Sequence, residues 1–204
     1  MSSSDVKAVF ITADTQALDA DGISTAAAVG EDAALTIGGA LASGGSCTFD
    51  SGRVVTILSA GDDSGISFTV AGTDVNTDSQ TESITGANAG TATGAKYFKT
   101  VTAITAVGDP AGNVSAGINA SAGDVIWAGR GRLQGISIVC SGTAGTLSFP
   151  TTSPAGTSQL KLGSVASATA TRDITIPEEG LLYASGIYVQ YTVSTFGTLT
   201  AFHA

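Results

Sequence analysis

Short segments in which hydrophobic and small polar residues alternate run through this chain, and they constrain its fold more than any other feature. In the clearest of them, Ile66, Phe68 and Val70 alternate with Ser67 and Thr69. Alternation with a period of two places the hydrophobic side chains on one face of a β-strand and the polar side chains on the other. Each such segment therefore predicts a strand that buries one face.

Similar segments recur about every ten residues, and many short strands with turns between them are typical of a β-sandwich or barrel. Before residue 120 they are 33–37, 47–49, 53–59, 66–70, 81–85, 96–107 and 114–118. After it they are 133–140, 146–149, 159–162, 173–176, 187–193 and 198–202. The polar, glycine-rich residues 60–65 predict a hairpin that pairs 53–59 with 66–70.

The composition also favours an all-β chain. With 27 glycines and 12% charged residues, the sequence is poor in the glutamate, lysine, glutamine and arginine that usually build surface helices. No run of about 18 apolar residues is present, so no membrane-spanning helix is expected. Hydrophobic residues recur along the whole chain, which argues against disorder.

A boundary between two units is expected within residues 117–123, which are mostly small and carry no charge. The charge balance changes nearby, because residues 1–110 hold 13 of the 17 acidic and 4 of the 8 basic residues, and the remainder is neutral overall. We expect two β-sandwich-like or barrel-like units of short antiparallel strands, formed by residues 31–120 and 121–204.

The extended N-terminal segment, residues 1–30, precedes these units. It has a brief hydrophobic start at Val9, Phe10 and Ile11 and continues with small and acidic residues. We interpret it as an arm that reaches a neighbouring subunit or as a first strand, and a short helix within it is a further alternative.

The charged and titratable residues argue against several functions. Eight scattered lysines and arginines in a chain of net charge −9 do not predict a surface for phosphate groups, so neither nucleic acid nor an anionic membrane is expected as a partner. The only histidine, His203, lies second from the C-terminal end, a poor position for a general base that must be held rigidly. We therefore expect no catalytic residue, no cofactor and no enzymatic activity.

Two aspartates, Asp62 and Asp63, lie in the expected loop 60–65 and are weak candidates for calcium ligands, because hard cations prefer carboxylate oxygens. The alternative is a solvated pair that shapes the turn. The segment Asp19–Gly22 resembles the start of an EF-hand loop, but Gly30 stands where the final glutamate is required. Cys47 and Cys140 lie far apart in the chain and are expected to be buried reduced thiols.

Trp127, Arg130 and Arg132 are the candidates for a protein interface. They are the only tryptophan and two arginines in a charge-poor half of the chain, and these residue types dominate the binding energy of many interfaces. The alternative is a core tryptophan beside ordinary surface arginines. A glycan site would instead need exposed aromatics, and Tyr183, Tyr188 and Tyr191 are the available ones, although Tyr191 alternates in phase with core residues.

Two parts of the sequence resemble known proteins. Residues 55–74, VTILSAGDDSGISFTVAGTD, and 81–102, TESITGANAGTATGAKYFKTVT, are similar to a module in virion structural proteins of tailed bacteriophages, especially those of marine and aquatic bacteria. The short motifs GRGRL at 129–133, IPEEG at 176–180 and IYVQY at 187–191 resemble small phage structural modules.

This resemblance implies a non-enzymatic component of the virion that assembles in the host cytoplasm. It points first to a capsid decoration or cement protein, which would stabilise the phage head through symmetric contacts between subunits. The implied partners are the major capsid protein or other virion proteins and further copies of the chain, with a trimer as the assumed homo-oligomer. A tail, neck or fibre-associated module that binds a receptor is the alternative, and no set of functional residues carries over.

Overall fold

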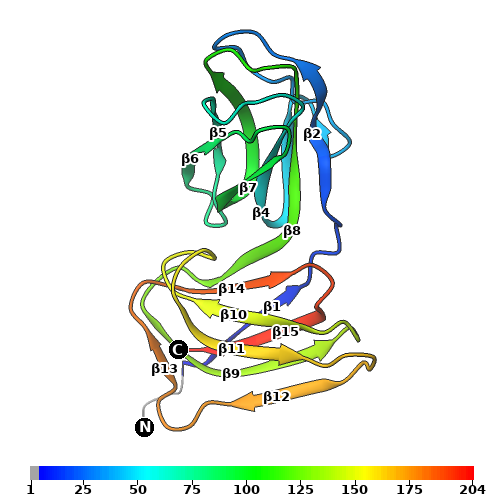
Figure 1. Cartoon of the computed structure of the whole chain (residues 1–204). Helices are drawn as coiled ribbons and strands as arrows, with labels where there is room; N and C mark the ends of the chain where they lie inside the picture. The colour runs from blue at the N-terminus through cyan, green and yellow to red at the C-terminus, as the bar shows by residue number, and fades with distance from the viewer. Residues whose placement is uncertain (1–4) are drawn as a thin grey trace. The chain divides into compact units, whose positions relative to one another are not determined.

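The computed structural model describes residues 5–204 and forms two units that are built from β-strands. Fifteen strands and no helix occur among these residues (Figure 1). Unit 1 consists of the described residues up to Gln16 together with Ser121–Ala204, and unit 2 is Ala17–Ala120. All strand pairs are antiparallel, which confirms the predicted all-β, sandwich-like fold class.

Unit 1 contains two antiparallel sheets. The first has the order β1 (Lys7–Thr12), β15 (Phe196–His203), β9 (Gly131–Cys140) and β12 (Thr171–Thr175), and β13 (Leu181–Tyr183) also pairs with β9. The second has the order β11 (Ser158–Ser164), β10 (Gly145–Pro150), β14 (Ile187–Thr192) and the C-terminal half of β8 (Asn113–Trp127). Buried residues from both sheets, such as Ile136, Leu199, Phe149 and Val189, form one core.

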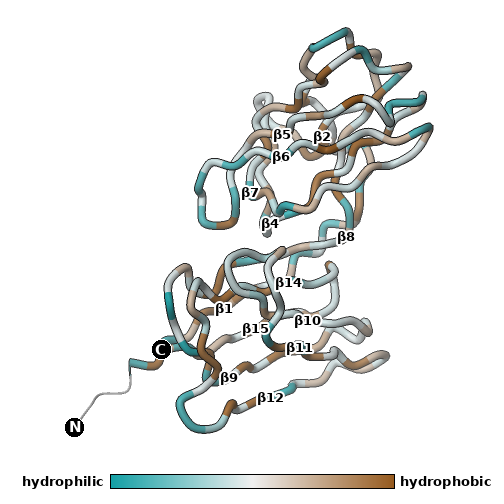
Figure 2. The backbone as a smooth tube through the Cα atoms, turned by 60° about the vertical axis from the view of Figure 1, so that its left-hand side comes forward, coloured by the Kyte–Doolittle hydropathy of each residue, from teal (hydrophilic) through white to brown (hydrophobic). Residues whose placement is uncertain are grey.

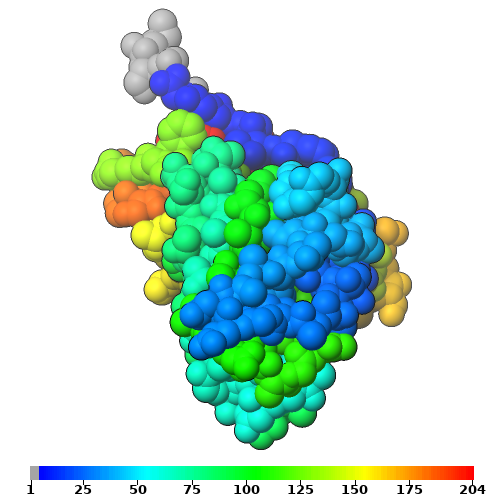
Figure 3. Space-filling view, turned by 90° about the horizontal axis from the view of Figure 1, so that it is seen from above, coloured from blue at the N-terminus to red at the C-terminus, as the bar shows by residue number. Residues whose placement is uncertain are grey.

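Unit 2 is built around two long strands, β4 (Ser46–Ser59) and β7 (Thr91–Val107). Its strand order is β8, β4, β7, β5 (Ser67–Thr73) and β6 (Ser79–Thr85); β2 (Asp19–Ala28) pairs with β8, and β3 (Ala42–Ser43) pairs with β4. Phe68, Val70, Phe98 and Ile104 lie in its core. The segment between β2 and β4 lies beside β7, where the Leu35 backbone N–H donates to Ile104 (Figure 3). In both units hydrophilic residues occur along the strands as well as in the loops (Figure 2).

The predicted hairpin between 53–59 and 66–70 is wrong. β7 lies between β4 and β5, and it pairs with both of them. The loop 60–65 does not fold back as a tight turn, because Asp63 is buried and its backbone N–H donates to the carbonyl oxygen of Ala87. The chain therefore crosses β7 before it forms β5.

Residues 117–123, where the boundary is predicted, lie within β8. A Cβ atom on Gly117 would lie 1.8 Å from the Asp19 carbonyl oxygen, and one on Gly123 would lie 2.5 Å from Pro154 Cβ. These glycines are required by close packing, as is common for glycine within strands. The change from unit 2 to unit 1 nevertheless falls inside this segment, between Ala120 and Ser121.

The described part of the N-terminal segment supplies one strand to each unit. β1 pairs with β15 in unit 1, and β2 pairs with β8 in unit 2. The alternative of a short helix is wrong, because 19–28 is strand, and the EF-hand alternative fails for the same reason. Residues 1–4 of the predicted arm lie outside the described residues.

Candidate functional site

Charged and aromatic residues of unit 1 gather around the exposed Trp127. We call this group the Trp127 cluster, and it consists of Trp127, Lys7, Arg130 and His203. The antiparallel ladder places Lys7 opposite His203 and His203 opposite Leu133, so the start of β1, the end of β15 and the start of β9 come together. The C-terminal Ala204 continues this ladder through two backbone hydrogen bonds with Arg132, of 2.7 and 3.0 Å.

The indole of Trp127 is contacted on several sides and is still 40% exposed. Its ring stacks on His203 with 5.2 Å between centroids, and Lys7 Nζ lies 5.3 Å from the ring centroid. The indole Nε1–H donates to the Arg130 carbonyl oxygen at 3.3 Å. These contacts hold an amphipathic ring in a fixed position at the surface, as suits a residue that binds a partner.

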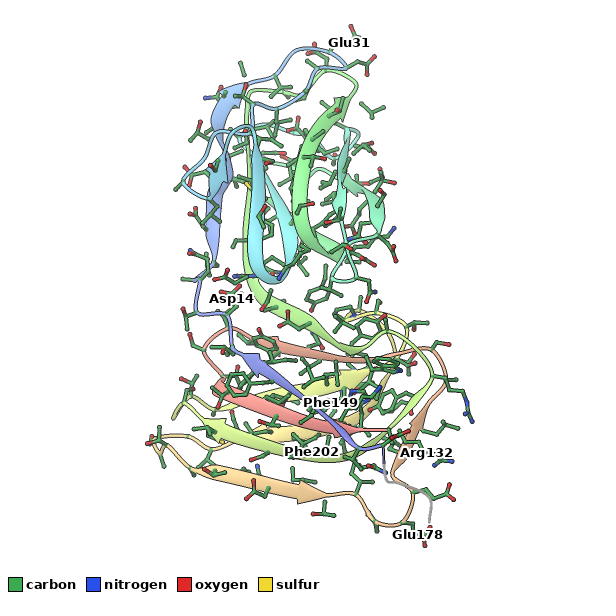
Figure 4. All side chains as sticks on the ribbon, turned by 180° about the vertical axis from the view of Figure 1, so that it is seen from behind. Asp14, Glu31, Arg132, Phe149, Glu178 and Phe202 are labelled. Carbon is green, nitrogen blue, oxygen red and sulfur yellow. The ribbon has the colours of Figure 1, made fainter. Side chains whose placement is uncertain are left out.

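The two predicted arginines differ in their partners. Arg132 Nη2 lies 3.0 Å from Glu179 Oε2, and Arg132 Nη1 donates to the Gly180 carbonyl oxygen at 3.3 Å (Figure 4). Arg130 is exposed, so its charge is presented to solvent. The structure therefore brings Trp127 and Arg130 together, whereas the guanidinium of Arg132 is paired to the β12–β13 loop.

The sequence does not indicate that Lys7 belongs to this site, and it presents His203 only as a histidine that is poorly placed to act as a general base. Lys7 lies 120 residues before Trp127, and no local pattern links them; the pairing of β1 with β15 brings them together. His203 is buried, and this burial, with a smaller effect from the nearby Lys7 charge, lowers its pKa. The imidazole is therefore neutral at pH 7 and stacks on the indole.

The two calcium candidates have separate structural roles. Asp62 lies at the surface, and its Oδ1 accepts hydrogen bonds from the Ser64 backbone N–H at 3.2 Å and Ser64 Oγ at 2.7 Å, which lower its pKa. Asp63 is fully buried, and its Oδ1 accepts the Ala111 backbone N–H at 2.7 Å. Within residues 5–204, no group of three histidine, cysteine or acidic side chains is placed to hold a metal ion.

The tyrosines near the C-terminus are buried and serve packing, so they do not form the exposed aromatic surface that a glycan site would need. Tyr183 donates to the Phe149 carbonyl oxygen at 3.1 Å, and Tyr191 donates to Asp124 Oδ2 at 3.1 Å. Tyr188 is also buried. Cys47 and Cys140 are buried free thiols, as predicted, and burial raises the pKa of the Cys47 thiol.

The charge divides between the two units almost as unequally as it divides along the sequence. Unit 2 holds 11 acidic and 3 basic residues, and unit 1 holds 6 acidic and 5 basic residues. The net charge is therefore −8 for unit 2 and −1 for unit 1.

Comparisons with models of protein families, with curated proteins and with solved structures find no match to this chain. Among the residues that the structure describes, no helix is long and apolar enough to cross a membrane.

Proposed function

We propose that this chain is a non-enzymatic structural protein of a tailed-phage virion, and specifically a capsid decoration protein that stabilises the head. The observation that carries the proposal is the Trp127 cluster, which gathers an exposed tryptophan, an accessible arginine and a lysine on the unit of nearly neutral charge. Tryptophan and arginine are the residue types that contribute most to protein–protein binding. The resemblance of residues 55–102 to phage virion modules supports the same role.

The division of charge suggests how such a protein would be oriented. Unit 1, with a net charge of −1, suits the contact with the shell, because a unit of little net charge meets little repulsion from a charged partner. Unit 2, with a net charge of −8, suits the surface that faces solvent, where like charge keeps particles apart. A role in the tail, neck or fibre remains the alternative, since those components need the same kind of interface.

The proposal is tested by adding the purified chain to phage heads assembled without it and measuring what stays bound after sedimentation. The wild-type chain is expected to bind, and the double variant Trp127→Ala/Arg130→Ala is expected to bind at least about ten-fold more weakly, the loss of a typical hot spot. Lys161→Ala, which alters an exposed lysine of the same unit, is the matched control and should bind normally. Binding to isolated tails but not to heads would favour the alternative, and binding to neither would contradict the proposal.

A further inference from the structure

The outward face of the β1–β15–β9–β12 sheet differs from an ordinary solvated sheet surface. The register aligns three cross-strand rows on this face, which we call the outer face. The rows are Ala8, Phe202, Gly135 and Thr175; Phe10, Thr200, Ser137 and Asp173; and Thr12, Thr198, Val139 and Thr171. Asp173 is the only charged residue among them, and hydroxyl groups and two exposed phenylalanines dominate the rest.

A depression of about 450 Å³ lies in this face. It forms where Gly135 leaves no side chain between its neighbours on β15 and β12. The residues that line it are Gln134, Gly135, Ile136, Ser137, Asp173, Ile174, Thr175 and Phe202. Its volume falls in the range of about 300–1,000 Å³ that is usual for small-molecule sites.

The walls of the depression are apolar on one side and polar on the other. A Cβ atom on Gly135 would lie 3.6 Å from Phe202 Cδ2, so the phenyl ring, which is 38% exposed, borders the floor directly (Figure 4). Across the floor, Asp173 Oδ1 accepts a hydrogen bond of 2.5 Å from Ser137 Oγ. This bond orients an exposed carboxylate, which is a strong acceptor for a ligand hydroxyl.

We propose that this depression binds a neutral saccharide, with one sugar ring on Phe202 and a sugar hydroxyl on Asp173. A sugar ring has an apolar C–H face that packs on an aromatic ring, and hydroxyls that both donate and accept hydrogen bonds. Thr175 and Gln134 supply side chains that can also do both, and Ser137 Oγ, which donates its proton to Asp173, can accept. The inference goes beyond the structural role proposed above and does not use the Trp127 cluster.

Other occupants fit this surface less well. An anionic ligand would meet Asp173 with no basic side chain among the lining residues. A quaternary ammonium group is usually held in a cage of several aromatic rings, and this depression has one. A second copy of the chain would need a larger contact area than the outer face provides. With strands about 4.8 Å apart and residues on one face of a strand about 6.8 Å apart, the twelve residues of the outer face cover roughly 400 Å². A standard interface buries roughly 800 Å² on each partner.

The binding experiment uses the full chain labelled with ¹⁵N and titrated with the neutral trisaccharides of glucose, mannose and galactose. Because the depression is open and has one aromatic wall, we expect a Kd in the millimolar range for at least one of them, so the titration extends to about 50 mM. The amide shifts should cluster at Gly135, Ser137, Asp173 and Thr175. Choline chloride and a sialylated trisaccharide, titrated in parallel, should leave these amides unchanged.

Two pairs of variants test whether the side chains of the depression hold the saccharide. Asp173→Asn should raise Kd at least about ten-fold, because it removes the charged acceptor, whereas Glu178→Gln, an exposed acid outside the depression, should not change it. Phe202→Ala should abolish binding, whereas Phe10→Ala, which removes the more exposed ring of the same face, should leave it intact. Thermal melts establish whether each variant is folded. If Phe202→Ala is unfolded, the comparison of Asp173→Asn with Glu178→Gln alone tests the inference.

Four results would overturn the inference. The first three are no clustered shifts with any neutral trisaccharide, shifts with choline but not with the saccharides, and equal weakening by Phe10→Ala and Phe202→Ala. Shifts of the same amides on raising the protein concentration alone would instead show that a second copy covers the outer face, and would also overturn it.

Discussion

Replacing Asp63 by alanine should destabilise unit 2 far more than replacing its neighbour Asp62. Asp63 is fully buried, and its Oδ1 accepts the Ala111 backbone N–H at 2.7 Å, which ties loop 60–65 to the turn before β8. A hydrogen bond to a charged group contributes about 1.5–3 kcal/mol, and the substitution leaves a partly buried N–H unpaired. We therefore expect Asp63→Ala to lower the free energy of unfolding by about 2–3 kcal/mol. Asp62 bonds only within its own turn at the surface, so Asp62→Ala should cost below about 1 kcal/mol.

The assay is calorimetric unfolding of the full chain, combined with hydrogen exchange of the peptide that contains Ala111. For a unit of 104 residues, the expected change corresponds to a decrease of roughly 8–15 °C in Tm. Asp63→Asn retains an acceptor for Ala111 but places an amide N–H donor at the buried Oδ2 position, which has no partner, so its cost should lie between those of Asp62→Ala and Asp63→Ala. Equal effects of Asp62→Ala and Asp63→Ala, or unchanged exchange at Ala111, would refute this reasoning.

Three other predictions concern buried groups. Burial and a nearby lysine lower the pKa of His203 below its ordinary value of 6.5. The stability that the neutral imidazole contributes is therefore complete above that pH and is lost as pH falls through the folded pKa. His203→Asn should reduce the loss of stability that urea unfolding measures between about pH 7.5 and 5.5, and an unchanged pH dependence would contradict this. Tyr183→Phe should cost about 1–2 kcal/mol in the same assay, because it leaves the Phe149 carbonyl oxygen without its donor, and a neutral effect would mean that the bond does not stabilise the fold. Cys47 and Cys140 should react with a thiol-specific dye only after denaturation, and rapid labelling of the native chain would show that the thiols are not buried.

The sequence predicts the strands well because their signal is local. Period-two alternation identifies β5, β9 and β14, and it also places Tyr191 in the core. The predictions fail where pairing depends on distant residues. The position of β7 between β4 and β5 cannot be read from loop 60–65, because it follows from the pairing of β7 with both strands.

Glycines have a second role that the sequence does not show. The predicted boundary in 117–123 does contain the change between the two units, but the segment is strand, and Gly117 allows β2 to approach β8, since a side chain there would clash with the Asp19 carbonyl. Gly135 likewise creates the depression beside Phe202. Sequence alone does not distinguish a glycine that permits a turn from one that permits close packing, because both consequences arise from the missing Cβ atom.

The candidate site is predicted in part. Trp127 and Arg130 are close in sequence, so their grouping can be proposed from residue types alone. Lys7 and His203 complete the cluster through the β1–β15 pairing, which joins the two ends of the chain.

The most direct test of the proposed structural role is the number of copies of this chain in purified virus particles, measured by quantitative mass spectrometry against labelled peptides. A capsid decoration protein, multiplied by the symmetry of the shell, is expected in hundreds of copies per particle. A few tens of copies or fewer would place it in the tail, neck or fibre instead. Its absence from the particles would contradict the structural role altogether.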